Sequence, residues 1–462
     1  MTDGTVATGG GEAPGGGRLG FWGVFAIGVG GMVGGGIFAV LGLAVDLSHG
    51  GTPLAFLVAG LVALLTSYSY VKLSVRYPSE GGTVEFINQA FGSGMVTGGL
   101  NVLLWISYIV MLSLYSFAFG SFGAQLLPSS WQVVGKHVLV TVVVLSMTGL
   151  NVLGSSSVGK AERWIVGLKL AILLLFIALG AWTVDSGRLA VSTWSPPVTL
   201  AAGGMIIFLA YEGFELIANT AGDVRDPSRT LPRAFYSSVV FVIVLYVLIS
   251  IVAVGNLSLD EIAAAKDYAL AAAAEPFLGN AGFLMISVAA LLSTASAINA
   301  TLYGSSRVSY VIAKEGELPE VFERRVWRGS MEGLFITAGV TLVVANTLDL
   351  NSISTMGSAG FLLVFAAVNW SHVKLHGVAG GSRWVSGTGA AVCVAALAIL
   401  VVQTVMDTPA NVLVLVVMVF AAFAIEFLYR RRTGRVILPF LREEFNRMHG
   451  YLEDFDNDGP GS

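Results

Sequence analysis

The segment Gly28–Phe38, GVGGMVGGGIF, places three consecutive glycines, Gly34 to Gly36, inside an apolar run long enough to cross a bilayer. Glycine in a helix interior costs about 1 kcal/mol relative to alanine, so a triplet predicts a broken helix. A second apolar run contains Phe208–Glu215, FLAYEGFE, in which two carboxylates flank Gly213. The alternative interpretation is that the glycines only let neighbouring helices pack closely.

The composition of the whole chain is that of a protein solvated by lipid. Of 462 residues, 55% are hydrophobic and only 12% are charged, and the mean hydropathy is +0.79. Soluble domains carry about 25% charged residues. Apolar surface on this scale cannot be buried in one water-soluble core. The composition therefore predicts an all-α membrane protein.

Runs of about twenty apolar residues, separated by charged or Gly/Pro turns, predict about twelve transmembrane helices. The tail 1–19 is Gly-rich and polar, and the tail 430–462 ends in the acidic stretch EDFDNDGPGS, so we expect both to be solvated. The approximate predicted spans are 20–46, 53–76, 95–126, 134–154, 161–184, 200–220, 232–255, 279–313, 333–348, 352–375, 384–405 and 409–429.

The distribution of basic residues predicts the orientation of these spans. If the N-terminus is inside, the predicted outer loops contain only Lys136, Arg188 and Lys266 of the 25 Lys and Arg residues. Most of the others lie in predicted inner loops, as the positive-inside rule requires. We therefore expect a multi-pass protein of the cytoplasmic membrane with both termini in the cytoplasm.

Breaking a helix in a bilayer exposes backbone groups that cost several kcal/mol each unless they find partners. A zwitterion could supply partners: amides of Gly34 to Gly36 would bind a carboxylate, and carbonyls near Phe208, Ala210 and Tyr211 would accept an ammonium. Matched interruptions in two halves of a chain are typical of a transporter's binding site. We expect substrate contacts from Met32, Val33, Gly34, Gly35, Gly36, Phe208, Leu209, Ala210, Tyr211, Glu212, Gly213, Tyr108 and Ser113.

Three motifs in order resemble the amino acid–polyamine–organocation superfamily of transporters. GGMVGGGIF (30–38) is similar to its first-helix signature. Ile207–Phe235 resembles the sixth helix and the following inner loop, with Gly-Phe-Glu and then a Pro-x-Arg-x-x-Pro-Arg pattern. Ser305–Pro319 resembles the end of the eighth helix. The resemblance covers essentially the whole chain.

This resemblance implies a five-plus-five inverted repeat, like that of the leucine transporter, with two peripheral helices and alternating access. The first repeat would span 20–184, the second 200–375, and the peripheral helices 384–429. The chain departs from the family pattern at Asp226, where Asn is usual, at Gly222, where an acidic residue is common, and at Leu209, where the family often has an aromatic lid.

Lys169 lies about two turns into the fifth span, and an ionisable residue there is a functional hypothesis by default. It resembles a lysine that replaces a structural sodium in some proton-coupled relatives, with a carbonyl near Gly30 or Val33 as its neighbour. Burial would favour release of its proton during the transport cycle. The alternative is a lysine that extends its head group to the inner membrane surface.

The remaining coupling candidates come from the sixth and eighth helices. Glu215 matches the acid of the family's Gly-Phe-Glu motif, which implies proton coupling or gating, and Glu212 could attract a cationic side chain. Alternatively, both could bond to freed backbone amides. Hydroxyls of the eighth helix face an ion in sodium-coupled relatives, although they also pack routinely. The candidate set is Lys169, Gly30, Glu215, Ser293, Thr294 and Ser296.

The sequence favours an amino-acid transporter, either a symporter, an antiporter or a uniporter, with a proton or sodium as the coupling ion. A polyamine or organic-cation carrier and a transporter-like sensor are the alternatives. The net charge of −4, five scattered histidines and one cysteine argue against nucleic acid binding, a metal site, a cofactor and an enzyme. No pore filter that would indicate a channel is recognisable.

Overall fold

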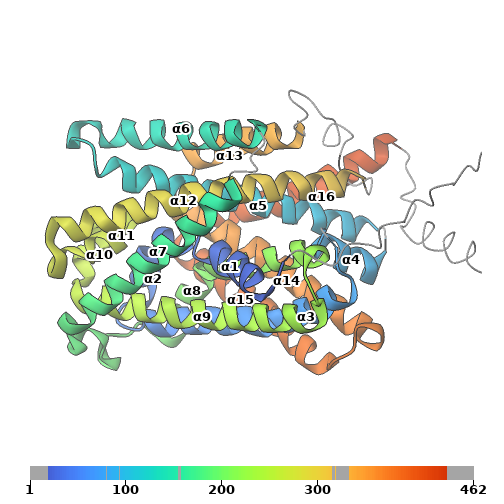
Figure 1. Ribbon diagram of the computed structural model, residues 1–462, viewed down its shortest axis with the longest axis horizontal. Coiled ribbons are helices and arrows are strands. Elements are labelled where there is room, and N and C mark those ends of the chain that lie inside the picture. Colours follow the sequence, from blue (N-terminus) through green and yellow to red (C-terminus); the bar gives the residue numbers. More distant parts are fainter. Residues whose placement is uncertain are drawn as a thin grey trace, which may run out of the picture.

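The computed structural model describes residues 19–79, 81–92, 94–153, 158–314, 318 and 332–433, with only the backbone described for 158–163, 432 and 433. The predicted tails therefore lie almost entirely outside the described residues. The long helices lie side by side along the long axis of the molecule (Figure 1). α6 and α13 lie at one edge, α3 and α9 lie at the opposite edge, and α1 lies between them.

The helices are α1 (Phe21–Met32), α2 (Gly36–Ser48), α3 (Thr52–Arg76), α4 (Thr83–Phe91), α5 (Met95–Ala124), α6 (Gln132–Leu153), α7 (Val158–Gly180), α8 (Pro197–Ile206), α9 (Pro227–Asn256), α10 (Leu259–Ala264), α11 (Ala269–Ala272), α12 (Glu275–Lys314), α13 (Glu332–Thr347), α14 (Leu350–Ala379), α15 (Arg383–Asp407) and α16 (Pro409–Thr433). The 3-10 helices are η1 (Ser129–Trp131), η2 (Ala181–Thr183), η3 (Ser186–Leu189), η4 (Val191–Thr193), η5 (Phe208–Asp223) and η6 (Lys266–Tyr268).

The described helices agree with the predicted number of spans. Nine of them are long and apolar enough to cross a membrane. The pairs α1/α2 and α8/η5 each make one further span, bent by 45° and 42°, and α13 is a shorter apolar helix of 16 residues. The bent pairs are the first and sixth spans in order, which is the spacing that an inverted repeat of five helices requires.

Several predicted bounds change. α9 begins at Pro227 rather than at 232, because proline is tolerated at the first helical position and Asp226 turns the chain with a φ of 50°. The sixth span is interrupted at Ile207, directly before the predicted segment, which itself forms η5. α4, α10 and α11 were not predicted, because they are too short to give a span-length apolar run.

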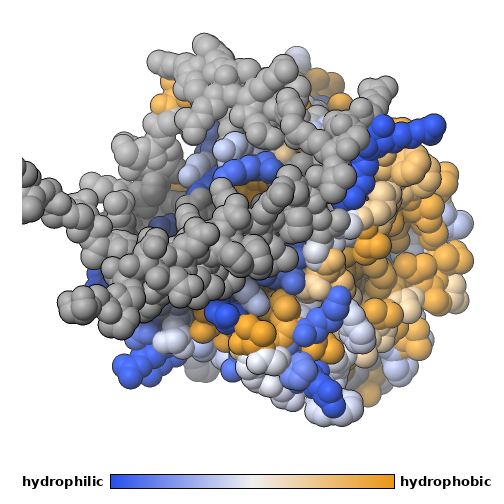
Figure 2. All heavy atoms as spheres, turned by 90° about the vertical axis from the view of Figure 1, so that its right-hand side faces the viewer, coloured by the Kyte–Doolittle hydropathy of each residue, from blue (hydrophilic) through white to orange (hydrophobic). Residues whose placement is uncertain are grey.

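Burial separates central from peripheral helices. α5 is buried along almost its whole length, whereas most described residues of α6, α7, α15 and α16 are at least partly exposed. Hydrophobic side chains cover a flank of the molecule, and hydrophilic ones gather around the end that faces the viewer (Figure 2). This is the distribution expected of a bundle whose sides contact lipid.

A buried polar cluster joins α15 to α3 and α14. Asn369 accepts a hydrogen bond from Ser69 Oγ at 2.7 Å and donates one to Thr66 Oγ1 at 3.2 Å. Ser69 Oγ also lies 2.7 Å from Ser386 Oγ of α15, and His372 contacts the same Ser386 oxygen at 2.7 Å. These bonds connect helices that are far apart in the sequence.

We predict that Asn369→Ala lowers the free energy of unfolding by about 1–3 kcal/mol, because hydrogen bonds between membrane helices contribute about 0.6–1.7 kcal/mol each. Thermal unfolding in detergent measures the loss. Asn346→Ala is the matched control, since Asn346 contacts His137 at an exposed position. Equal losses in the two variants would contradict a stabilising role for the cluster.

Candidate functional site

The break between α1 and α2 is a turn at Val33–Gly35 whose carbonyls bond to side chains of other helices. Lys169 Nζ donates to the Gly30 carbonyl at 3.1 Å, and Tyr246 Oη donates to the Met32 carbonyl at 2.7 Å. Ser293 Oγ lies within hydrogen-bond reach of the Val33 carbonyl, at 2.8 Å, and of the Gly34 carbonyl. Residues of α7, α9 and α12 thus replace the missing helical bonds.

The break between α8 and η5 has equivalent partners on α14. The Ile206 carbonyl accepts hydrogen bonds from Ser354 Oγ at 2.7 Å and Ser358 Oγ at 2.9 Å. The Leu209 amide donates to Ser358 Oγ at 3.2 Å. One hydroxyl therefore bonds to backbone groups on both sides of the interruption.

The two breaks lie against each other, and glycine makes this approach possible. A Cβ at Gly36 would lie 2.8 Å from Ala210 Cα, and a Cβ at Gly31 would lie 2.9 Å from the Gly213 carbonyl. Tyr246 Oη, which donates to Met32, also lies 3.4 Å from the Ala210 carbonyl. The discontinuous helices are therefore joined by backbone packing and by one hydroxyl.

The amides that begin α2, which are predicted to bind a carboxylate, are covered by other parts of the protein. The Gly34 amide donates to the Gly31 carbonyl at 3.3 Å, whereas the amides of Gly35 and Gly36 find no acceptor within the described part of the chain. A Cβ at Gly35 would lie 3.0 Å from Thr294 Cγ2 and closer still to the Tyr115 ring. In this conformation the glycines also let neighbouring helices pack closely, as the alternative interpretation of the glycine triplet predicts.

Glu215 is fully buried and satisfied by its neighbours. Tyr108 Oη donates a hydrogen bond to its Oε1, and Tyr70 Oη lies 3.4 Å from Oε2. Tyr70 and Thr83 share a further bond of 2.8 Å, and Asn219 Nδ2 lies 3.4 Å from Tyr108 Oη. The carboxylate thus links η5 to α3, α4 and α5.

Glu212, one 3-10 turn earlier, is also buried, with 3% of its surface exposed. Its Oε2 has no hydrogen-bond partner among the described residues. The chain therefore places two neighbouring carboxylates in different surroundings.

Of the other predicted residues, Leu209 lies against Gly357, and Tyr211 donates to the Phe56 carbonyl at 2.9 Å. Phe208 packs on Phe365. Thr294 bonds to Ala290 in its own helix. Ser113 bonds to the Ile109 carbonyl and reaches the Thr341 carbonyl of α13 at 3.4 Å, so it is turned away from the breaks. Ser296 makes no hydrogen bond to either break among the described residues.

Four residues that contact the breaks are not indicated by the sequence pattern: Tyr115, Tyr246, Ser354 and Ser358. Each carries a hydroxyl in an apolar span, and a hydroxyl in hydrocarbon needs a partner. That requirement was the available signal, but many other spans in this chain also carry Ser, Thr and Tyr. No group of three or more metal-binding side chains occurs among the described residues.

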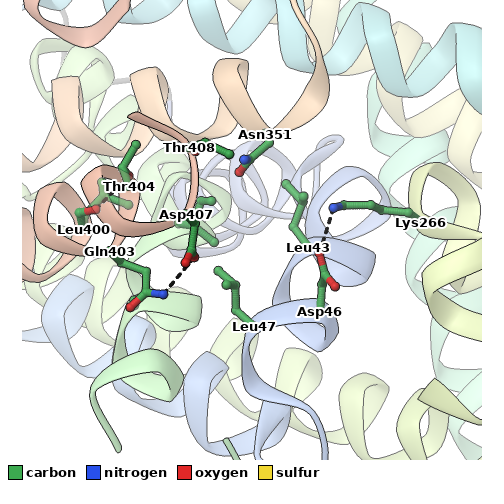
Figure 3. Close-up of a pocket in the computed structure, with 12 residues that line it drawn as sticks. Leu43, Asp46, Leu47, Lys266, Asn351, Leu400, Gln403, Thr404, Asp407 and Thr408 are labelled. Atoms are coloured by element: carbon green, nitrogen blue, oxygen red, sulfur yellow. Dashed lines mark hydrogen bonds and ion pairs between the residues drawn. The ribbon is translucent and has the colours of Figure 1, made fainter. Parts of the chain in front are cut away.

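A pocket of about 340 Å³ opens between α2, α8 and α15 at the end of the bundle that carries η6. Lys266 Nζ and Asp46 Oδ2 form an ion pair at 2.8 Å on one side of it, and Gln403 donates to Asp407 at 2.8 Å on the other (Figure 3). Ile206, the last residue of α8, also lines the pocket. The wall of the pocket therefore includes the residue directly before the break at Ile207.

Comparison with known proteins gives a consistent result. The chain matches the model of the family described as amino acid permease over residues 19–425. An uncharacterized protein of Methanocaldococcus jannaschii is 38% identical over 370 residues, 79% of this chain and 84% of that protein. The inner membrane transport protein YbaT of Escherichia coli is 36% identical over 355 residues, 76% of this chain and 82% of that protein. The methylthioribose transporter of Bacillus subtilis is 23% identical over 372 residues, 76% of this chain and 79% of that protein.

We predict that Tyr246→Phe lowers the free energy of unfolding by about 0.6–1.7 kcal/mol, because it removes the hydroxyl that bonds to the Met32 carbonyl inside the bundle. Thermal unfolding in detergent measures this change. Tyr236→Phe, at a half-buried position of the same helix, is the control. An unchanged midpoint for the Tyr246 variant would show that the break does not depend on this bond.

Proposed function

The chain belongs to the amino acid permease family, and we propose that it carries amino acids across the cytoplasmic membrane by alternating access. Family membership makes it a multi-pass transporter rather than an enzyme. The observation that supports the proposal most directly is the pair of contacting breaks in the first and sixth spans. Beside them, the Gly35 and Gly36 amides have no acceptor among the described residues.

The proposed substrate pose uses both breaks. The α-carboxylate binds the amides of Gly35 and Gly36, where the N-terminus of α2 favours negative charge. The α-ammonium lies near the carbonyls of Phe208, Ala210 and Tyr211. Because Tyr115 and Ala210 now fill the space beside the glycines, substrate binding requires α2 to separate from α5 and η5.

The pocket between α2, α8 and α15 is the proposed route by which substrate reaches this site from outside. Lys136 and Lys266, which the sequence assigns to outer loops, lie at the same end of the bundle: Lys136 pairs with Asp267 at 2.9 Å, and Lys266 pairs with Asp46 of α2. This supports the proposal that both termini lie in the cytoplasm. The Lys266–Asp46 pair ties the outer half-helix α2 to η6 and has to loosen for α2 to move.

Lys169 is the proposed proton-coupling group. Its side chain is 1% exposed, so it does not extend to the membrane surface. A protonated amine holds α1 through the Gly30 carbonyl, and loss of the proton weakens that bond and lets α1 tilt. Proton movement at Lys169 would thus accompany the change between the inward and outward conformations.

A polyamine or organic-cation carrier is the second candidate. It is favoured by the buried carboxylate of Glu212, which needs a positive partner. The substrates of such a carrier need no carboxylate, so they would not require the amides of Gly35 and Gly36. A requirement for the substrate's α-carboxylate therefore separates the two functions.

We predict that at least one α-amino acid raises the apparent melting temperature of the purified protein, since a ligand of the folded state stabilises it by mass action. The screen contains the twenty amino acids, ornithine, agmatine and putrescine. Gly35→Ala should abolish the shift, because the new methyl group occupies the space through which the carboxylate would approach the Gly35 amide. Gly149→Ala, where a Cβ meets nothing within 4 Å, should retain it.

Stabilisation by amines alone would instead support the polyamine carrier. Retained amino-acid binding by folded Gly35→Ala would contradict the proposed carboxylate contact.

We predict that Lys169→Ala loses accumulation driven by a pH gradient, while substrate still equilibrates across the membrane. Proteoliposomes with an inward proton gradient and radiolabelled substrate measure both quantities. Lys374→Ala, at an exposed position, is the matched control and should accumulate substrate normally. Undiminished concentration of substrate by the Lys169 variant would exclude this residue as the coupling group.

A further inference from the structure

Glu212 is a buried carboxylate whose charge is not balanced by a neighbouring cation. No ion pair joins it to a basic side chain of the described residues, and its Oε2 accepts no hydrogen bond there. Glu215, the nearest ionisable group of η5, has the same sign and acts on it electrostatically. A buried carboxylate is unfavourable unless a cation or a proton joins it, so a ligand cation that reaches Glu212 would take the place of that proton.

The carbonyls that end α1 and α8 already accept hydrogen bonds from side chains. Lys169, Tyr246 and Ser293 bond to the carbonyls of the first break. Ser354 and Ser358 bond to the carbonyl that ends α8. Glu212 Oε2 is thus a strong acceptor beside the breaks that the described side chains leave open.

Glu212 shares its surroundings with the proposed carboxylate contact. It acts electrostatically on Tyr115 and Tyr246. Tyr115 Oη would lie 3.5 Å from a Cβ at Gly34, and the Tyr115 ring covers Gly35. Tyr115 therefore covers the glycine turn and lies in the neighbourhood of Glu212. Aromatic faces also attract cations.

The 3-10 geometry of η5 explains why Glu212 and Glu215 face the same helix. With three residues per turn, Leu209, Glu212 and Glu215 lie on one face. Glu215 contacts Tyr108 of α5 and Leu209 packs near Val110 of α5, through Gly357. Tyr108 also interacts with Glu212 electrostatically. Glu212 therefore lies on the face of η5 that contacts α5, the helix whose Tyr115 covers the glycines.

We propose that Glu212 binds the side-chain cation of a basic amino acid, so that the substrates are α-amino acids with an ammonium or guanidinium group. This inference rests on the proposed function, in which the α-carboxylate occupies the Gly35 and Gly36 amides. The substrate then spans the site from the glycine turn to Glu212, with the Tyr115 ring beside its aliphatic chain.

The test compares three ligands. L-Lysine has both the α-amino acid group and a side-chain amine, L-norleucine lacks the side-chain amine, and cadaverine lacks the carboxylate. Equilibrium binding to purified wild-type protein should be at least tenfold tighter for lysine than for norleucine. Glu212→Gln should weaken lysine binding at least tenfold and leave norleucine binding unchanged. Glu275→Gln, an exposed matched control at the start of α12, should bind as the wild type does.

The outcomes separate this inference from the proposed function. Equal affinities of the wild type for lysine and norleucine would overturn the role of Glu212 and leave amino-acid transport intact. An equal loss of both ligands in Glu212→Gln would also overturn it. Cadaverine binding as tight as lysine binding would support the cation contact and contradict the carboxylate contact with the Gly35 and Gly36 amides. Failure of every amino acid to bind the wild type would overturn both proposals.

A second variant covers the case in which Glu212→Gln does not fold. Glu212→Asp keeps the negative charge on a shorter side chain, so it should retain a preference for lysine over norleucine. Loss of that preference in folded Glu212→Asp would contradict a contact that depends on charge.

Discussion

Backbone polar groups inside a bilayer must find partners within the protein, and this constraint governs the centre of the molecule. The glycine turn at Val33–Gly35 interrupts one helix and the kink at Ile207 interrupts another, which leaves carbonyls without helical donors. Lys169, Tyr246 and Ser293 bond to the first set, and Ser354 and Ser358 bond to the second. The helices that surround the breaks are therefore positioned by the same bonds that make the breaks possible.

These bonds also connect the structure to conformational change. Tyr246 lies within reach of the Met32 and Ala210 carbonyls, one on each side of the contact between the discontinuous helices. Hydroxyl and ammonium donors can exchange acceptors at small cost, whereas a continuous helical ladder cannot. A site closed by such bonds can open without melting either helix. The covered amides of Gly35 and Gly36 belong to the closed arrangement seen here.

The two acids of η5 show how surroundings divide the tasks of similar residues. Glu215 accepts a bond from Tyr108 and lies near Tyr70, so it joins α5 and α3 to η5. Glu212 lies one turn away without a partner for Oε2 among the described residues. A satisfied carboxylate fixes the local geometry, and an unsatisfied one is open to a ligand. Only Gly213 and Phe214 separate the two acids in the sequence, and this local context does not reveal the difference.

The sequence by itself determined the lipid-solvated helical architecture, the number of spans and the discontinuity in the first of them. These properties depend on the length of apolar runs and on local helix propensity, which are encoded by consecutive residues. Only the tertiary structure decided that Ser293 reaches the broken backbone while Ser113 turns to α13, and that Tyr115 covers the glycines. Those outcomes depend on how each helix is rotated against distant segments, because a hydroxyl in an apolar span bonds to whichever acceptor the packing brings within reach.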